Sequence, residues 1–153
     1  MRYLRILAAG VMLATILFTL AACQDVASPL ENYGWILTQY GRPGDIKQAL
    51  ADTEINVYFD SKTKTVSGSS GCNTYGGSYA VDHLTLTITG PISMTEMSCG
   101  GEKDLQENEY INILKNAANF EVERGQLIIH SGMDELRFKR AGAGFKTVNY
   151  WQE

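Results

Sequence analysis

Short runs in which apolar and polar residues alternate recur along most of the chain, and they predict β-strands. In residues 84–88 ("LTLTI") three apolar side chains share one face and two threonines take the other. That alternation is typical of an antiparallel sheet with one solvated face. Similar runs predict strands over residues 35–40, 55–60, 64–69, 77–81, 83–89, 119–123, 126–131 and 135–140.

One later segment has the spacing of a helix. Between residues 102 and 118 the apolar positions repeat as on one helix face, at Tyr110, Ile111, Leu114, Ala117 and Ala118. Glu102 and Asp104 fall in its first turn, where carboxylates suit the helix dipole. A shorter helix is also expected over residues 45–52. Together these elements predict the α+β class, with one main helix covering an apolar face of the sheet.

The N-terminus has the pattern of a secretory signal. Arg2 and Arg5 precede an apolar run over residues 6–20, and small residues precede Cys23. The tetrapeptide ending at Cys23 ("LAAC") resembles the lipobox of bacterial lipoproteins, in which the cysteine becomes the lipidated first residue of the mature chain. An uncleaved membrane anchor is the alternative, because residues 6–23 are just long enough to span a bilayer.

The lipobox resemblance implies an order along the chain and a location. Residues 1–22 would be a signal peptide, and residues 23–32 would be the lipidated cysteine and a tether. Gln24, and not aspartate, follows the cysteine. By the sorting rule for such lipoproteins, this implies anchoring in the cell envelope, at the periplasmic face of the outer membrane if the cell is Gram-negative.

Charge narrows the range of partners. Removal of residues 1–22 takes away two of the 13 basic residues and none of the 17 acidic ones, so the net charge changes from −4 to −6. A mildly acidic chain without a basic stripe excludes nucleic acid as a partner. It is also not attracted to anionic lipid, so the lipid on Cys23 would be the link to the membrane. The remaining 131 residues suffice for one domain, which we expect to be a monomer.

Two cysteines remain once Cys23 is assigned to the lipid. In an oxidising compartment Cys72 and Cys99 are expected to form a disulfide, which would stabilise the fold by about 3.5 kcal/mol. The alternative is two separate buried thiols. The two histidines, His83 and His130, lie far from both cysteines in sequence, so no metal site is indicated. No cofactor site is indicated either.

Residues 67–79 ("SGSSGCNTYGGSY") are rich in glycine, but they do not match a reaction site. They lack the lysine and the following helix of a phosphate-binding loop, and their serines lack the spacing of a nucleophile elbow. Cys72 has no histidine base nearby in sequence. Glycine allows a bend or a close backbone approach, and Asn73 can bond its own turn, so the stretch predicts a bent strand.

The same stretch closely resembles the signature of the META domain family, which includes HslJ-like heat-shock lipoproteins. Its matching positions are Gly68, Gly71, Cys72, Asn73, Tyr75, Gly77 and Tyr79. Two further motifs follow in the family's order, Thr95-x-Met97-x-Cys99 and Glu107-x-x-Tyr110-x-x-x-Leu114, and Trp35-x-Leu37 is similar to its first strand. The resemblance covers residues 33–140. It implies a single α+β domain in which an antiparallel, partly barrel-like sheet packs around one main helix.

The resemblance implies less about function. The family is associated with stress and drug tolerance in bacteria, and its motif carries no catalytic activity. We therefore expect a non-enzymatic envelope protein that acts by binding. The alternative is a pilot or assembly lipoprotein that grips a secretion or outer-membrane partner in the concave face of the sheet. An enzyme using Glu96, Glu102 or Asp104 is a third hypothesis, although acids at these positions more often cap a helix.

Two segments extend beyond the simple domain. Residues 41–54 make a long first connection that we expect to form a lip over one end of the sheet. The tail, residues 141–153, carries Phe145, Tyr150 and Trp151. These aromatic residues either dock on the surface of the domain itself or form a contact site for a protein partner.

Overall fold

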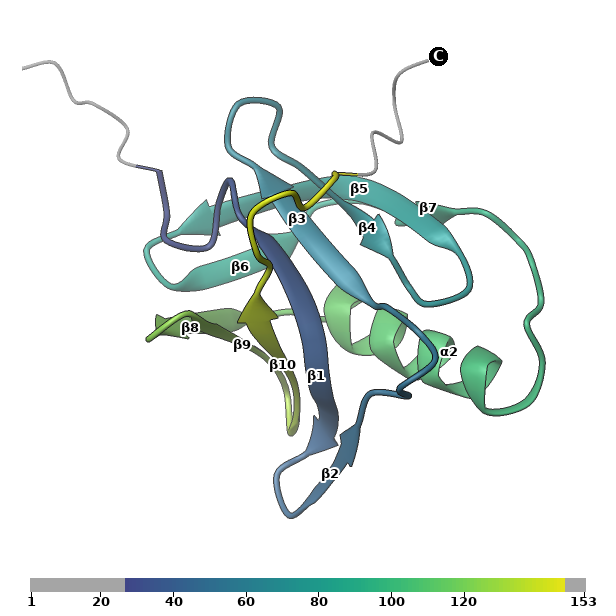
Figure 1. Cartoon of the computed structure of the whole chain (residues 1–153). Helices are drawn as coiled ribbons and strands as arrows, with labels where there is room; N and C mark the ends of the chain where they lie inside the picture. The colour runs from purple at the N-terminus through teal and green to yellow at the C-terminus, as the bar shows by residue number, and fades with distance from the viewer. Residues whose placement is uncertain (1–26, 148–153) are drawn as a thin grey trace, which may run out of the picture.

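The computed structural model describes residues 27–147 (Figure 1). The predictions for the signal peptide, for Cys23 and for Tyr150 and Trp151 fall outside the described residues. Within residues 27–147, no helix has both the length and the apolar character needed to cross a bilayer.

Ten strands and one helix make up the described chain. The strands are β1 Gly34–Arg42, β2 Asp45–Gln48, β3 Asn56–Asp60, β4 Thr65–Ser69, β5 Thr74–Asp82, β6 Thr85–Ile88, β7 Ser93–Met94, β8 Asn119–Glu123, β9 Gln126–Ser131 and β10 Asp134–Arg140. The helix is α2 Gly101–Lys115. The expected single α+β domain is confirmed, with β structure predominating.

Eight of the strands close into an antiparallel barrel. Their order is β1, β3, β4, β5, β6, β8, β9 and β10, and β10 pairs back onto β1. That closing pair runs from Trp35 opposite Arg140 to Gly41 opposite Glu135. The joint between β6 and β8 is much shorter, with Thr85 opposite Asn119. Strands β2 and β7 lie outside the ring, on β1 and β5.

Side chains fill the inside of the barrel. The inward positions of the strands alternate with outward ones, and the inward residues form one continuous core. Its largest fully buried members are Trp35, Tyr75, Tyr110, Phe59, Phe120 and Phe138. The expected apolar face is therefore the interior of a closed barrel, and the solvated face is its outside.

The two ends of the barrel differ (Figure 1). The β3–β4, β5–β6 and β8–β9 turns lie at one end, together with the N-terminal turn that precedes β1. We call this the tether end. Helix α2 connects β7 to β8 and lies at the opposite end, where it contacts β1, β6, β9 and β10. We call this the helix end.

The helix expected over residues 45–52 is wrong. Residues 45–48 form β2, which pairs with the end of β1 from Gln39 to Arg42. Gly41 and Gly44 have positive φ angles of 114° and 97°, so they turn the chain back on itself. Sheet hydrogen bonds therefore override the helix propensity of a segment too short to be helical alone.

The lip expected from residues 41–54 does lie over one end of the barrel, against α2. Leu50 donates its N–H to the Gln106 side chain, and Gln106 donates to Thr53. Lys47 forms an ion pair with Glu109 on the same helix at 2.7 Å.

Several helix and strand boundaries also differ from those that the sequence predicted. Helix α2 ends at Lys115, because the N–H of Ala118 bonds to His130 in the sheet. Strand β5 begins at Thr74, three residues before the expected start, and β7 was not expected. Leu84 lies in the β5–β6 turn and is 56 % exposed, so it does not share the buried face of Leu86.

Candidate functional site

Most of the family-motif residues lie at the helix end, whereas Tyr79 bonds to Glu31 in the N-terminal turn at the tether end. Four of them and the neighbouring Ser70 form a partly buried network of hydrogen bonds that we call the motif cluster. Its members are Ser70, Asn73, Thr95, Met97 and Glu107. They come from the β4–β5 turn, the loop after β7 and the helix. The network thus joins three separate segments of the chain.

Asn73 uses every hydrogen-bonding position of its side chain. Its amide nitrogen donates to Glu107 Oε2 at 2.8 Å and to the Met97 carbonyl at 2.9 Å. Its oxygen accepts from Thr95 Oγ1 and from the Met97 N–H, both at 2.8 Å. A side-chain amide has two donors and two acceptor positions, so Asn73 is saturated. Met97 takes part only through its backbone, and its side chain is 61 % exposed.

Glu107 is a buried carboxylate held by donors that are formally neutral. It accepts from the Ser70 hydroxyl and from both the backbone and the side chain of Asn73. Among the described residues it forms no salt bridge. Three hydrogen bonds thus offset the cost of burying the charge.

The predicted disulfide between Cys72 and Cys99 is confirmed, with Cα atoms 5.9 Å apart. It ties the β4–β5 turn to the segment that leads into α2. Asp104, in the first turn of α2, accepts hydrogen bonds from Ser98 Oγ at 2.7 Å and from the Cys99 N–H at 2.9 Å. These bonds hold the pKa of Asp104 below its usual value. Asp104 therefore holds the residues that precede the helix, and α2 has no side-chain hydrogen bond at its N-cap, Gly100.

Two motif glycines are needed for different reasons. At Gly68 a Cβ atom would overlap the carbonyl oxygen of Asn56 and lie 2.9 Å from the Tyr75 hydroxyl. At Gly71 the backbone has a φ of 97°, which L side chains rarely adopt. At Gly77 there is more room, because an added Cβ atom would lie 3.4 Å from its nearest neighbour, a side-chain carbon of Ile92.

The motif tyrosines are also tied to the fold. Tyr75 donates its hydroxyl hydrogen to the Asn56 carbonyl at 3.0 Å, so Tyr110 donates to Tyr75 across 2.6 Å. Both rings are fully buried, as is Leu114. Burial raises the pKa of both tyrosines, which keeps them neutral. The motif cluster and its tyrosines therefore hold the helix onto the barrel.

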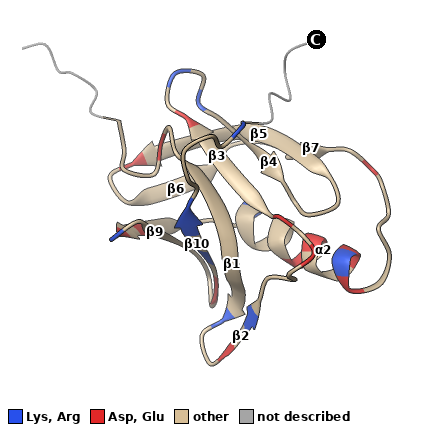
Figure 2. Cartoon of the chain, in the orientation of Figure 1, with Lys and Arg blue, Asp and Glu red and all other residues tan. Residues whose placement is uncertain are grey.

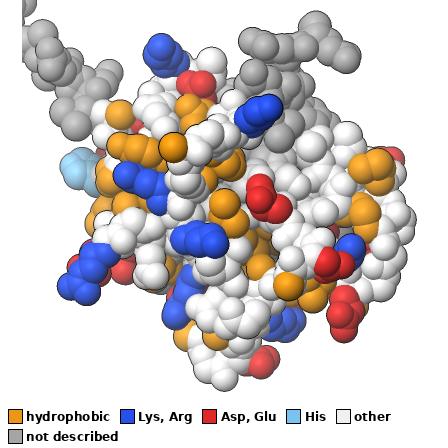
Figure 3. All heavy atoms as spheres, in the orientation of Figure 1, with side chains coloured by type: hydrophobic (Ala, Val, Ile, Leu, Met, Phe, Trp, Pro, Cys, Tyr) orange, Lys and Arg blue, Asp and Glu red, His pale blue; other side chains and the backbone are white. Residues whose placement is uncertain are grey.

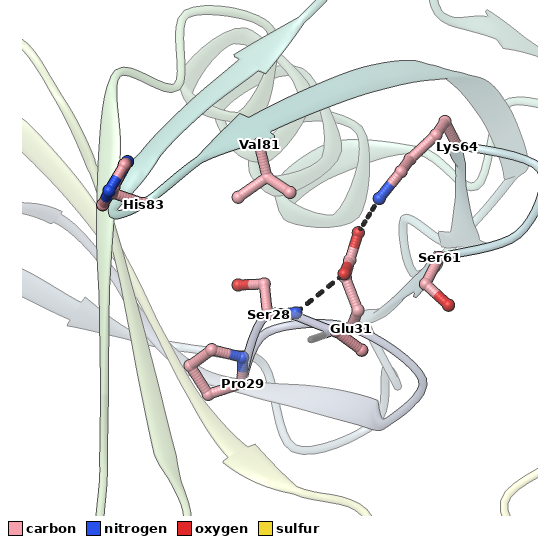
Figure 4. A pocket seen from close by; sticks show the side chains of 8 residues that line it. Ser28, Pro29, Glu31, Ser61, Lys64, Val81 and His83 are labelled. Atoms are coloured by element: carbon pink, nitrogen blue, oxygen red, sulfur yellow. Dashed lines mark hydrogen bonds and ion pairs between the residues drawn. The ribbon is translucent and has the colours of Figure 1, made fainter. Parts of the chain in front are cut away.

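A second polar site lies at the tether end, which we call the hollow (Figure 4). It has a volume of about 560 Å³. Its walls come from the N-terminal turn, the β3–β4 turn and the β5–β6 hairpin, and they consist of Ala27, Ser28, Pro29, Glu31, Ser61, Lys64, Val81 and His83.

Glu31 forms one wall of the hollow and is only 2 % exposed. Tyr79 donates to it at 2.5 Å, Lys64 at 2.6 Å and the Ser28 N–H at 2.9 Å. Burial raises the pKa of Glu31, but the three hydrogen bonds and the Lys64 charge outweigh burial and lower it. Glu31 is therefore held as a carboxylate by three hydrogen-bond donors of the protein itself.

Sequence reasoning placed Tyr79 in the motif but missed Glu31, Lys64 and Ser28. Glu31 fell in the segment interpreted as a tether. The available signal was a turn preceding the first strand, with serine three residues before glutamate, as in a capping box.

Of the three aromatic residues of the tail, Phe145 lies within the described residues. Its ring packs against Gly34 of β1, where a Cβ atom would overlap it, and it is half-buried. The Ala141 N–H bonds to the Gly34 carbonyl at 2.8 Å, which holds the start of the tail on the barrel. For Phe145, docking on the domain itself is the observed arrangement.

Surface charge and exposed apolar residues are scattered. Acidic and basic residues are scattered over the strands and the helix in Figure 2. On the face seen in Figure 3, charged and polar side chains break up the hydrophobic ones. The large exposed apolar residues of the described chain belong to five different segments: Tyr33, Leu84, Met97, Leu105 and Met133.

Comparisons with known proteins agree with this architecture. The family model described as META domain matches residues 28–143. An NMR structure of a protein from Burkholderia xenovorans is similar, with a TM-score of 0.64 and 23 % identity over 78 % of this chain and 96 % of that one. A second NMR structure has a TM-score of 0.58 and 24 % identity over 74 % and 95 %.

A crystal structure of a DUF4847 family protein from Bacteroides vulgatus has a TM-score of 0.51 and 16 % identity over 72 % of this chain and 94 % of that one. At these identities the three structures support the fold alone. The search of curated proteins found no match.

Proposed function

The chain belongs to the META domain family, and we propose that it is a non-enzymatic, lipid-anchored protein of the bacterial cell envelope. In this proposal it supports tolerance of stress or toxic compounds by binding, and it contributes no chemical step. The family match and the "LAAC" sequence ending at Cys23 are the starting points.

The saturation of the motif cluster is the observation that carries the non-enzymatic part. A catalytic group must reach a substrate, but the side chains of Asn73 and Glu107 are buried and bonded to other parts of the chain. Cys72 is in a disulfide and cannot act as a nucleophile. Tyr75 and Tyr110 are bonded to each other. The buried side chains of these motif residues are thus engaged in holding the fold.

The position of the N-terminal turn supports anchoring at one end. Leu30 in this turn is fully buried in the core, and its carbonyl accepts a hydrogen bond from the Trp35 indole at 2.9 Å. A lipid on Cys23 would therefore hold the tether end of the barrel toward the membrane and leave the helix end away from it.

The test compares the full chain with its Cys23→Ser variant in a strain that lacks the protein. We expect the wild type to partition into detergent and to restore growth under heat or toxic compounds. The variant should lose both properties, because lipidation is the strong membrane attachment of the chain. Equal partitioning of a variant shown by mass to lack residues 1–22 would overturn the anchor, and unchanged tolerance would overturn the role.

The pilot alternative has one specific observation in its favour. Leu105 on α2 is 69 % exposed beside a shallow depression of about 290 Å³ that Tyr40 and Leu50 also line. Because side chains fill the barrel, a partner would dock at such an outer site and not in the concave face of the sheet. A stoichiometric partner recovered from membranes with the wild type, but not with Leu105→Glu, would favour this role.

A further inference from the structure

We propose that the hollow at the tether end binds the phosphodiester group of a membrane phospholipid. The inference rests on the proposed anchoring at Cys23, because the anchor is what would bring this end of the barrel to the lipid headgroups. The side chains that line the hollow favour an oxygen-rich anion of low charge.

Two serine hydroxyls from different turns belong to the lining of the hollow. The Ser28 hydroxyl is buried and has no hydrogen-bond partner among the described residues, and in Figure 4 it points away from Glu31. Such an unpaired buried hydroxyl is unfavourable, and a ligand oxygen that accepted its hydrogen would remove that penalty. Ser61 Oγ accepts from the Asn32 amide at 2.9 Å, so its own hydrogen remains to be donated.

Lys64 adds a cation to these hydroxyls. Its ammonium has three N–H groups, and one of them is used by Glu31 at 2.6 Å. The side chain is 51 % exposed, so the other N–H groups remain accessible. His83 brings a ring nitrogen to the rim, while Asp82 holds its other nitrogen at 2.7 Å.

The charge of the site selects the kind of anion. The Lys64 charge is balanced by Glu31, whose two oxygens are already engaged by the protein. A dianionic phosphate would add a second negative charge beside this carboxylate. A phosphodiester carries a single charge, and a zwitterionic headgroup also avoids repulsion by the acidic chain as a whole.

The apolar part of the lining of the hollow and its position at the tether end are both suited to binding a lipid. Ala27, Pro29 and Val81 give the hollow an apolar side against which a glycerol backbone could lie. Ala27 is four residues from Cys23, so the chain between them spans at most about 14 Å when fully extended. A lipid-anchored Cys23 would therefore keep the hollow close to the headgroup layer.

The experiment uses a chain that starts at residue 23 and carries Cys23→Ser, so that no covalent lipid is present. It keeps the whole described barrel and its core, which lie within residues 27–147. Dihexanoylphosphatidylcholine, below its micelle concentration, is titrated while amide NMR shifts are followed. We expect saturable shifts at Ser28, Ser61, Lys64 and His83, and much weaker ones with inorganic phosphate.

Serine variants test the contacts without breaking the fold. Ser28→Ala removes a hydroxyl with no partner in the protein, and it should raise the Kd about three- to tenfold with unchanged unfolding. Ser78→Ala, on the exposed face of β5, is the matched control and should leave the Kd unchanged. Lys64 is left intact, because its loss would remove a partner of the buried Glu31.

Three results would overturn the proposal: no saturable shifts at these amides, equal binding of inorganic phosphate, or equal effects of Ser28→Ala and Ser78→Ala. Because this chain carries no lipid, such a failure is independent of the Cys23 test. The proposed anchoring can then stand while the hollow is rejected, or the reverse.

Discussion

Asn73 and Glu107 are joined by two hydrogen bonds although 34 residues separate them in the chain. The Asn73 side-chain nitrogen donates to Oε2 at 2.8 Å, and its backbone nitrogen donates to Oε1 at 3.0 Å. The bonds connect the β4–β5 turn to the second turn of α2. The residue that the motif places after the first cysteine thus fixes the helix on the end of the barrel.

We therefore expect Asn73→Ala to destabilise the fold by about 3 kcal/mol, measured by urea unfolding. The substitution leaves Glu107 with one donor fewer and removes both side-chain bonds to the Met97 backbone. Asn112→Ala, on the exposed face of the same helix, is the control and should change stability by less than about 0.5 kcal/mol. Similar values for the two variants would contradict the anchoring role of Asn73.

Gly68→Ala should be among the most damaging single-methyl changes in the chain. The added carbon would overlap the Asn56 carbonyl oxygen, which itself accepts the Tyr75 hydroxyl. We expect a loss of about 3 kcal/mol or more, because a backbone atom and not a side-chain tip must move. The control is Gly90→Ala, where a Cβ meets nothing within 4 Å and should be tolerated. Thermal unfolding of the two purified variants, compared with wild type, makes the measurement.

The sequence predicted most strands and the main helix because their signals are local. Alternation and helical spacing are visible within a few residues, and α2 and eight of the strands lie close to the expected positions. Barrel closure has no such signal, because β1 and β10 meet through residues about a hundred positions apart, such as Thr38 and Arg137. The prediction for residues 45–48 was wrong for the same reason, because pairing with β1 determines the conformation of β2.

The two polar sites show the same contrast. The motif residues could be named in advance, because glycines, cysteines and tyrosines at fixed spacings form a recognisable pattern. Glu31 could not be, because its burial depends on Lys64 and Tyr79, which are 33 and 48 residues away. A glutamate in a polar segment carries no local sign that tertiary contacts will enclose it.

The disulfide should contribute about 3.5 kcal/mol, because it closes a loop between residues 27 positions apart. Alkylation of the denatured, never-reduced protein should add no group at Cys72 or Cys99 by intact mass. Reduction should lower the melting temperature of the wild type. A Cys72→Ser, Cys99→Ser double variant should melt at that lower temperature with or without reductant. Two added alkyl groups before reduction would show free thiols and refute the pairing.

The Glu31 ion pair predicts a specific dependence of stability on pH. Its hydrogen bonds and the Lys64 charge lower the folded-state pKa below the usual 4.5, so the folded chain holds this proton less tightly than the unfolded chain does. Its stabilising contribution is therefore complete above about pH 4.5 and is lost as the pH falls through the lowered pKa.

Glu31→Gln should be clearly less stable than wild type at neutral pH, because Lys64 and Tyr79 then face an uncharged amide. The difference should shrink as the pH approaches about 3. Urea unfolding across this range gives the measurement, with the exposed Glu96→Gln as control. If the difference in unfolding free energy between Glu31→Gln and wild type stays constant, or grows in acid, the pKa of Glu31 is not lowered in the folded protein. The N-terminal turn would then be held by other contacts.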